Sequence, residues 1–320
     1  MQEIQISANE SGQRLDKLLA KYLNEAPKSF LYKMLRKKNI VLNGKKASGN
    51  EKLTAGDSVK LFLSDETIQK FSKEINVCKV NTDLDILYED EDILLVNKPV
   101  GMLSQKAEAK DISLVEHLIS YLLESGQLTK ENLRSFKPSI CNRLDRNTSG
   151  LVVCGKSLKG LQTMGQLFKE RTLKKYYRCI VAGTVTEKQY VKGYLIKDEK
   201  KNQVTVSDTY FPDSQEIETE YRPIQQLKAG TLLEVHLITG KTHQIRAHLA
   251  SQGHAIIGDY KYGNRETNDR YKKEYHLSYQ LLHAYRLEMP KIEELPQLSE
   301  KIFIAPLPKQ FKKIVEGESR

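Results

Sequence analysis

One loop of the sequence combines residue types that suit nucleophilic chemistry. In the stretch NRLDRNTSG a single carboxylate, Asp145, lies between Arg143 and Arg146, directly before the apolar run LVVCG. A loop that precedes a strand presents its side chains without burying them. Neighbouring guanidinium groups favour the ionised form of a carboxylate, so Asp145 is expected to be nucleophilic at neutral pH. An ordinary Asx turn capped by Thr148 or Ser149 explains the same residues, and the loop alone leaves both interpretations open.

Several ordered motifs resemble one enzyme family. NRLDRNTSG is similar to the HRLDxxTSG signature of the RluA-type pseudouridine synthases, in which this aspartate is the catalytic residue. KKYYRCIVAG resembles the K-x-Y-x-A stretch of that family, and TGKTHQIRAHLASQGHAIIGDYKYG resembles its TGRTHQIR…GDxxYG block. VNKPVGM, LLHAYRLEM and APLP extend the resemblance over nearly the whole chain beyond Leu84.

The resemblance implies a reaction and three catalytic residues. The bond between ribose and the uracil nitrogen is broken, the base turns, and it is rejoined through carbon 5. Asp145 is the expected catalytic carboxylate, either attacking base or sugar or removing a sugar proton, and Arg246 is expected to pair with it. Tyr177 is expected to stack on the uracil and to help remove the proton from carbon 5, with plain core packing as the alternative.

The resemblance also suggests residues that contact RNA. Because the target uridine must be flipped out of its stack, Arg143 is expected to occupy the vacated space, unless it forms a salt bridge to a nearby acid. Lys98 and His243 are predicted to contact RNA as well. The motifs depart from the family pattern in that Asn142 replaces a histidine, Asn147 replaces an acid, and Lys241 replaces an arginine.

The sequence gives no support to a cofactor or a metal. It contains no glycine-rich dinucleotide motif and no Walker motif, and the isomerisation needs no electron acceptor or phosphate donor. A metal hydrolase built from His243, His248 and Asp259 is a rival hypothesis, but two histidines five residues apart do not share one face of a helix. We therefore expect no cofactor, no nucleotide and no metal.

Composition bounds the class of protein. The chain has 320 residues, of which 39% are hydrophobic and 29% charged, and its net charge is +10. No apolar run approaches the ~18 residues of a membrane span, and the N-terminus does not resemble an export signal, so a cytoplasmic location without membrane contact is expected. Four scattered cysteines argue against a zinc ribbon or a disulfide scaffold. The positive charge suits a polyanionic partner.

The charge is concentrated near the N-terminus. A helix is predicted over residues 15–22, capped by Ser11, and another over 29–38, followed by the hairpin IVLNGKKA and the strand GDSVKLFL. These pieces resemble the RNA-binding domain named after the fourth small-subunit ribosomal protein, the S4 domain. Seven basic residues and no acid lie between Pro27 and Asn50, and an ordinary solvated face is the alternative reading of them. Those predicted to contact RNA are Lys37, Lys38, Lys45 and Lys46.

The predicted organisation has three parts: an α/β S4-like RNA-binding domain at 1–63, a linker at 64–83 and a catalytic domain at 84–320. Strand and helix patterns beyond Leu84 indicate an α+β domain with a predominantly antiparallel sheet, and the C-terminal helix PKQFKKIVEG is expected to pack on it.

Family members with an appended RNA-binding domain typically act on large-subunit ribosomal RNA. The resemblance therefore favours 23S ribosomal RNA, or the assembling large subunit, over transfer RNA. A non-catalytic RNA-binding factor in ribosome assembly is the competing hypothesis.

Overall fold

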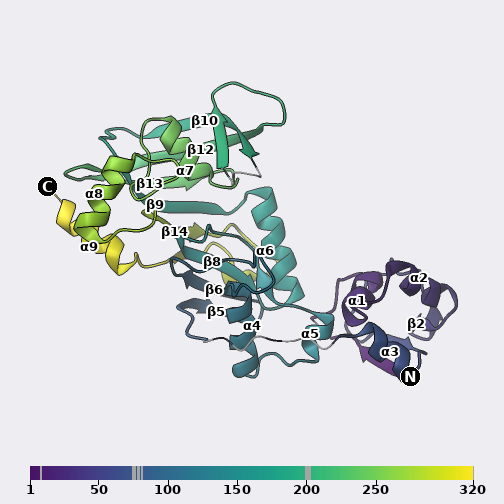
Figure 1. Ribbon diagram of the computed structural model, residues 1–320. Helices are drawn as coiled ribbons and strands as arrows, with labels where there is room; N and C mark the ends of the chain where they lie inside the picture. The colour runs from purple at the N-terminus through teal and green to yellow at the C-terminus, as the bar shows by residue number, and fades with distance from the viewer. Residues whose placement is uncertain (8, 74–76, 78–79, 81, 199–202, 320) are drawn as a thin grey trace.

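The computed structural model describes residues 1–7, 9–73, 77, 80, 82–198 and 203–319. In Figure 1 a small N-terminal part lies beside a larger body that contains the rest of the chain. Each part has its own β-sheet and its own cluster of buried apolar side chains. No helix in the described part of the chain is long and apolar enough to cross a membrane.

The N-terminal part is built on a four-stranded antiparallel sheet with the order β1-β4-β2-β3. Helices α1 and α2 bury apolar residues that recur at helical spacing, as predicted. Asn43 and Gly44 turn the chain between β2 and β3 with φ values of 51° and 73°, which suits a two-residue hairpin. The elements are β1 (Gln2–Gln5), α1 (Leu15–Tyr22), α2 (Lys28–Arg36), β2 (Ile40–Leu42), β3 (Lys45–Lys46) and β4 (Ser58–Leu61).

Two details of this part differ from the sequence expectation. The residue before α1 is Arg14, which makes no side-chain cap, so the prediction that Ser11 caps the helix is wrong. The interval 64–83, expected to be a linker, contains helix α3 (Asp65–Phe71), and the Ser64 hydroxyl accepts a hydrogen bond from the Thr67 N–H at its start. Because Ile68 of α3 is buried in the N-terminal apolar cluster, this helix packs with the N-terminal part.

The larger body contains an eleven-stranded sheet in the order β11-β10-β12-β13-β9-β14-β8-β6-β5, with β15 on β14 and β7 on β8. Among the described strands every pair is antiparallel except β14 with β8, so the predicted α+β class is confirmed. The strands are β5 (Ile86–Glu89), β6 (Ile93–Lys98), β7 (Ser139–Ile140), β8 (Ser149–Gly155), β9 (Lys174–Ala182), β10 (Gln189–Asp198), β11 (Gln203–Ser207), β12 (Gln215–Gln226), β13 (Gly230–Leu237), β14 (Leu282–Glu288) and β15 (Ile302–Ile304).

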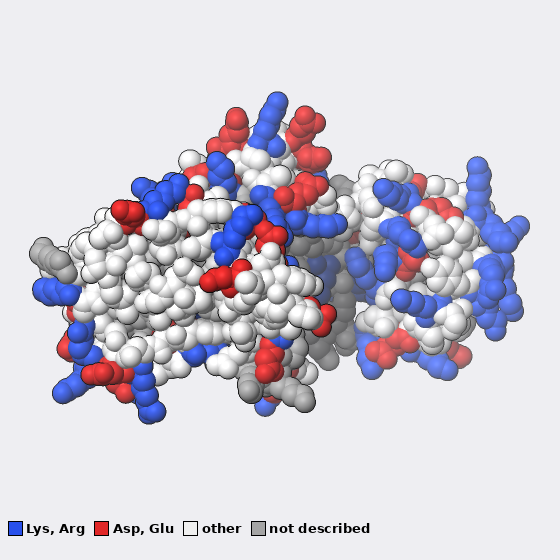
Figure 2. All heavy atoms as spheres, turned by 90° about the horizontal axis from the view of Figure 1, so that it is seen from above, with Lys and Arg blue, Asp and Glu red and all other residues white. Residues whose placement is uncertain are grey.

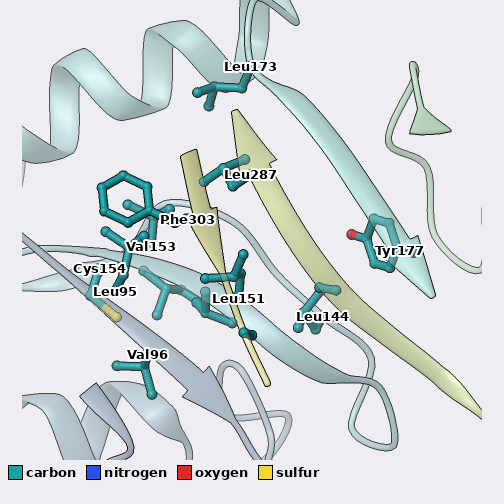
Figure 3. Close-up of a cluster of buried hydrophobic side chains, with 14 of the residues drawn as sticks. Leu95, Val96, Leu144, Leu151, Val153, Cys154, Leu173, Tyr177, Leu287 and Phe303 are labelled. Atoms are coloured by element: carbon teal, nitrogen blue, oxygen red, sulfur yellow. The ribbon is translucent and has the colours of Figure 1, made fainter. Parts of the chain in front are cut away.

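Helices cover both faces of the central strands. On β9, Cys179 belongs to the main apolar core while its neighbour Ile180 packs in a second cluster with Phe311 and Ile314 of the C-terminal helix. Figure 3 shows part of the main core, where Leu95, Val153 and Phe303 lie together. The remaining helices are α4 (Leu114–Glu124), α5 (Asn132–Ser135), α6 (Leu158–Glu170), α7 (Gln244–Ser251), α8 (Arg265–Tyr275), the 3-10 helix η1 (Pro296–Leu298) and α9 (Lys309–Glu318).

The start of β8 is fixed against β14 at Gly150. This glycine has a φ of 111°, and a Cβ at its position would lie 2.2 Å from the Ala284 carbonyl oxygen. One residue earlier, the Ser149 hydroxyl is 2.8 Å from His283 Nδ1, and both side chains are buried. Only glycine allows the two backbones to approach so closely, so the NRLDRNTSG loop leaves the sheet at a defined place.

The two parts of the molecule meet at α5. The Ser135 hydroxyl donates to Glu10 Oε1 at 2.6 Å, and the Arg134 guanidinium lies 3.9 Å from the centre of the Tyr22 ring. Gly12 adds a contact to α6, because a Cβ there would lie 3.7 Å from Gln162 Oε1. The N-terminal part is therefore attached through polar and cation–π contacts.

Candidate active site

Asp145 lies in the loop between β7 and β8, at the wall of a cavity of about 670 Å³. The loop backbone is held by the Ser104 hydroxyl, which accepts from the Leu144 N–H at 3.0 Å and donates to the Leu144 carbonyl at 2.8 Å. The Thr148 N–H donates to the Asp145 carbonyl at 3.0 Å and closes the turn. The Asp145 side chain is 29% exposed, so a ligand in the cavity can reach it.

Arg246 of α7 connects two aspartates. Its Nη1 donates to Asp145 Oδ2 at 2.9 Å, as the resemblance implies. Its Nε and Nη2 donate to the two carboxylate oxygens of Asp259 at 2.6 and 2.9 Å, which is a bidentate pair. Asp259 is 1% exposed and so shields this contact from water. The guanidinium is thereby oriented by Asp259 and presents Nη1 to Asp145.

The charge of Arg246 is secure in this setting. Burial by itself lowers the pKa of Arg246, but the hydrogen bonds and charges of Asp259 and Asp145 outweigh burial and raise it. A buried cation with two carboxylate partners remains protonated at any pH at which the protein is folded. Asp145 therefore has a permanent positive partner.

His243 approaches the same oxygen of the Asp145 carboxylate that Arg246 contacts. Its φ of 53° is unusual for a histidine, and its Nε2 is 3.8 Å from Asp145 Oδ2. The Nδ1 atom and the Tyr262 hydroxyl are 2.9 Å apart. Because that hydroxyl oxygen already accepts from the Val204 N–H at 2.9 Å, its own proton is best donated to Nδ1, which leaves the ring proton on Nε2.

The ring of His243 is held in the neutral form. Burial lowers the pKa of His243, and the charges of Arg246 and Lys261 act in the same direction, against the charges of Asp145 and Asp259. Burial also raises the pKa of Tyr262, so its hydroxyl keeps the proton that it donates. A neutral imidazole thus presents an N–H group toward Asp145.

Tyr177 of β9 lines the same cavity and belongs to the main core. Its side chain is 8% exposed, and Figure 3 shows it at the end of the apolar cluster that includes Leu144. Burial raises the pKa of Tyr177, and the negative charge of Asp145 raises it further. The phenol is therefore protonated at neutral pH and forms an apolar wall beside the carboxylate.

Lys98 does not lie where the prediction placed it. The side chain is fully buried, and its Nζ donates to the carbonyl oxygens of Pro99, Met102 and Arg146 at 3.0, 2.8 and 3.2 Å. Burial lowers its pKa to about 7, against the opposite effect of the Asp145 charge. The predicted RNA contact is corrected, because all three donor positions of the ammonium are used to hold two loops together.

The cavity has a strongly basic lining. Among the described residues that line it, nine are Lys or Arg, and the only carboxylate is Asp145. Arg143 is one of them, is exposed, and has no ion-pair partner in the described part of the chain, so the predicted salt bridge to an acid is not found. The basic lining residues are Lys106, Arg143, Arg146, Lys169, Arg171, Lys175, Lys197, Lys241 and Arg246.

The three departures from the family motifs lie in and beside this cavity. Asn142 bridges to β8, since its Oδ1 accepts from the Val153 N–H at 2.8 Å and its Nδ2 donates to the Leu151 carbonyl at 3.3 Å. Lys241 lines the cavity wall, and Asn147 belongs to the loop between β7 and β8 but does not line the cavity. None of the three residues takes part in the hydrogen bond between Arg246 and Asp145.

The residues of the rival metal hypothesis are engaged elsewhere. His248 Nδ1 lies 2.9 Å from the Thr219 hydroxyl, Asp259 binds Arg246, and His243 faces Tyr262. In the parts of the chain that the structure describes, no three His, Cys, Asp or Glu side chains are grouped as metal ligands.

The four predicted lysines of the N-terminal part do not line this cavity. Lys37 and Lys38 follow α2, and Lys45 and Lys46 form β3, and all four are exposed. Figure 2 shows Lys and Arg side chains gathered at the outer end of the N-terminal part. We call the exposed residues Lys28, Lys33, Arg36, Lys37, Lys38, Lys45 and Lys46 the N-terminal basic surface.

Sequence reasoning missed three residues of the site. Asp259 was weighed only as a metal ligand, Tyr262 was quoted in GDYKYG without a role, and Lys175 stood in the K-x-Y motif unremarked. Their signal was present, because each belongs to a motif that already resembled the family. The partners of Asp259 and Tyr262, namely Arg246 and His243, lie 13 and 19 residues away in the sequence.

Comparisons with known proteins agree with this site. A family model described as RNA pseudouridylate synthase matches residues 92–251. The chain is 30% identical to "Ribosomal large subunit pseudouridine synthase C" of Vibrio vulnificus (strain CMCP6), covering 99% of this chain and 96% of that protein. It is 31% identical to the protein of the same name from Pasteurella multocida (strain Pm70), covering 97% and 91%.

The fold is shared with a solved structure. "Human RNA Pseudouridylate Synthase Domain Containing 4" aligns with a TM-score of 0.57 and 21% identity, covering 72% of this chain and 91% of that one. Sequence motifs, fold and the arrangement around Asp145 therefore agree, and the chain belongs to the RNA pseudouridylate synthase family, whose members are RNA isomerases.

Proposed function

We propose that this chain converts uridines of 23S ribosomal RNA, free or in the assembling large subunit, to pseudouridine in the cytoplasm. Both curated relatives named above are described as acting on the large ribosomal subunit. The observation that carries the proposal is the Asp145 carboxylate, paired with Arg246 at 2.9 Å in a basic cavity. The isomerisation requires no electron acceptor, phosphate donor or metal.

Asp145 is the catalytic carboxylate in this proposal. Arg246 holds it in position through the 2.9 Å contact, and the partly exposed side chain faces a cavity large enough for a nucleotide. Attack on the base, attack on the sugar and removal of a sugar proton all need a carboxylate in this position. His243 Nε2 lies 3.8 Å from Asp145 Oδ2, so its N–H faces the carboxylate without a hydrogen bond to it and is placed to donate to an oxygen of the bound nucleotide.

Tyr177 supplies a flat surface for the flipped base. Its ring forms part of the cavity wall, and aromatic rings stack on bases regardless of their sequence. Because its pKa is raised, little phenolate exists at neutral pH, which makes the stacking role stronger than the role of a general base.

Extrusion of the uridine leaves a gap in the RNA. Arg143 is exposed at the cavity wall, and a guanidinium group can both stack on bases and bind phosphate. Flipping costs a few kcal/mol and costs least in a loop or bulge, so loops of ribosomal RNA are the expected substrates.

The N-terminal part, an S4-like domain in this proposal, binds flanking RNA. The N-terminal basic surface carries seven exposed cations on α2 and the β2–β3 hairpin. Next to it lies a cavity lined by Tyr32, Arg36 and Lys46, which combines a partly exposed ring with positive charge. Such a combination suits a polynucleotide that offers both phosphates and base faces.

An Asp145→Ala variant tests the proposal in cells that lack the native gene. Pseudouridines are mapped at nucleotide resolution in ribosomal RNA after complementation with the native chain, with Asp145→Ala, or with Asp269→Asn, which changes an exposed acid of α8. We expect the native chain and Asp269→Asn to restore the same sites and Asp145→Ala to restore none. Restoration by Asp145→Ala would favour the non-catalytic assembly factor.

A further inference from the structure

One lysine of the cavity is placed beside the catalytic groups without a role in the chemistry above. Lys175 lies two residues before Tyr177 on β9, so the two side chains share a face of the sheet, and both line the cavity. Its Nζ lies over the backbone of Gly240, where a Cβ would be only 3.3 Å away. The ammonium is therefore half-buried in the cavity wall, in a space that glycine leaves open.

A second cation converges on the same place. Arg171 ends helix α6 with a φ of 61°, a left-handed conformation that is uncommon for arginine, and it lines the cavity as well. Neither the Lys175 nor the Arg171 side chain makes a hydrogen bond or an ion pair within the described part of the chain. Two like charges without a carboxylate repel each other, and an anion between them removes this cost.

The surroundings of Lys175 disfavour its charged form. Burial lowers the pKa of Lys175 to about 8, and the positive charge of Arg171 lowers it further. At neutral pH the ammonium is still mostly protonated, but a bound anion would stabilise the charged form and raise this pKa.

We propose that Lys175 and Arg171 form a binding site for one phosphate of the RNA backbone next to the flipped uridine. The site is in the same cavity as Asp145, so a phosphate bound there would belong to the reacting nucleotide or to a neighbour of it in the RNA chain. RNA supplies one phosphate for each nucleotide, and ammonium and guanidinium groups are its usual ligands. The inference rests on the proposed function, since it assigns part of the substrate to named residues.

Adjacent lysines provide a matched test. Lys174 is exposed and its side chain lies on the opposite face of β9, so Lys174→Met removes the same charge outside the cavity. With unmodified large-subunit ribosomal RNA transcribed in vitro, we expect Lys175→Met to weaken binding by roughly tenfold and Lys174→Met to have little effect. The slope of log affinity against log salt should fall by about 0.7 in Lys175→Met.

The pH dependence of RNA binding separates a specific contact from general charge. Phosphate binding needs protonated Lys175, so affinity should fall by up to roughly tenfold between pH 7 and pH 9 in the native chain. Lys175→Arg keeps the charge over this range and should abolish the fall. The other charged and titratable groups around the cavity are unchanged in this variant, namely Asp145, His243, Cys141, Tyr177, Lys106, Arg143, Arg146, Lys169, Arg171, Lys197, Lys241 and Arg246.

Two further arms identify the source of the phosphate. In a synthetic stem-loop, the phosphate beside the target uridine is replaced by a neutral methylphosphonate. The native chain and Lys175→Met should bind this RNA with equal affinity. If inorganic phosphate binding depends on Lys175 while RNA affinity does not, the site binds a free anion and the RNA assignment is overturned. An equal loss of RNA affinity in Lys174→Met and Lys175→Met would also overturn the assignment of Lys175 to an RNA phosphate. A native chain that forms no pseudouridine contradicts the proposed function itself, whatever Lys175 does.

Discussion

The cavity around Asp145 and the N-terminal basic surface both concentrate positive charge, yet they are built in different ways. In the cavity, Arg246 is held by two carboxylates at 2.6 to 2.9 Å, and Asp259 behind it is 1% exposed. On the N-terminal basic surface the seven cations are exposed and come from one continuous segment. Fixed geometry suits chemistry at one atom, whereas mobile exposed charges suit a polyanion of variable shape.

Asp259→Asn should have the largest effect, because it should lower kcat at the cavity while leaving RNA binding by the N-terminal basic surface nearly unchanged. The variant removes a buried carboxylate from Arg246, so Arg246 keeps its charge with weaker orientation, and we expect kcat to fall by about a hundredfold. The loss of a buried ion pair should also lower the free energy of unfolding by about 3 kcal/mol. Pseudouridine formation and thermal unfolding measure these effects, with Asp269→Asn as the control. If RNA affinity fell as steeply as kcat, the assignment of chemistry to the cavity and of RNA binding to the N-terminal basic surface would be contradicted.

Replacing Lys37, Lys38, Lys45 and Lys46 together by glutamine should act on binding alone. Affinity for ribosomal RNA should fall by about tenfold or more, and the salt slope should decrease by about 3, because four phosphate contacts are removed. The kcat at saturating RNA should be unchanged. The matched control replaces four exposed lysines of α8 and α9, namely Lys272, Lys273, Lys312 and Lys313. Equal losses in both variants would show that only net charge matters.

Tyr262→Phe should have the smallest effect and tests the finest detail of the cavity. Without the hydroxyl, His243 Nδ1 loses its donor, and the ring proton is free to move from Nε2 to Nδ1. We expect kcat to fall by roughly tenfold with KM nearly unchanged. Nitrogen NMR of His243 should show the Nε2–H form in the native chain and a mixture in the variant. Tyr260→Phe, in the same turn and exposed, should leave both unchanged.

The sequence predicted local elements better than distant contacts. Apolar spacing was sufficient for α1, α2 and the hairpin at Asn43 and Gly44, because each depends on neighbouring residues. It gave no strand for residues 189–226, where β10 and β12 carry many charged and polar residues on a partly exposed sheet. It also left α3 as linker, since one buried isoleucine is a weak signal.

The same distinction applies to the site. The pairing of Asp145 with Arg246, 101 residues apart, came only from resemblance to a family, and no local pattern would have joined them. Lys98 was predicted to contact RNA from the resemblance to the family, and only the fold shows it enclosed by three carbonyl groups. Burial of a charged group depends on packing that periodicity does not report.

Helix α6 has a consequence for how substrates are chosen. Near its start Gln162 meets Gly12 of the N-terminal part, and at its end Lys169 and Arg171 line the catalytic cavity. From Gln162 to Arg171 the helix rises by about 14 Å, at roughly 1.5 Å per residue. Helix α6 therefore sets a distance between the N-terminal part and the catalytic cavity. If the N-terminal basic surface holds flanking RNA, as we propose, the target uridine must lie at a matching distance from that contact, so the choice of uridine depends on distance as well as on sequence.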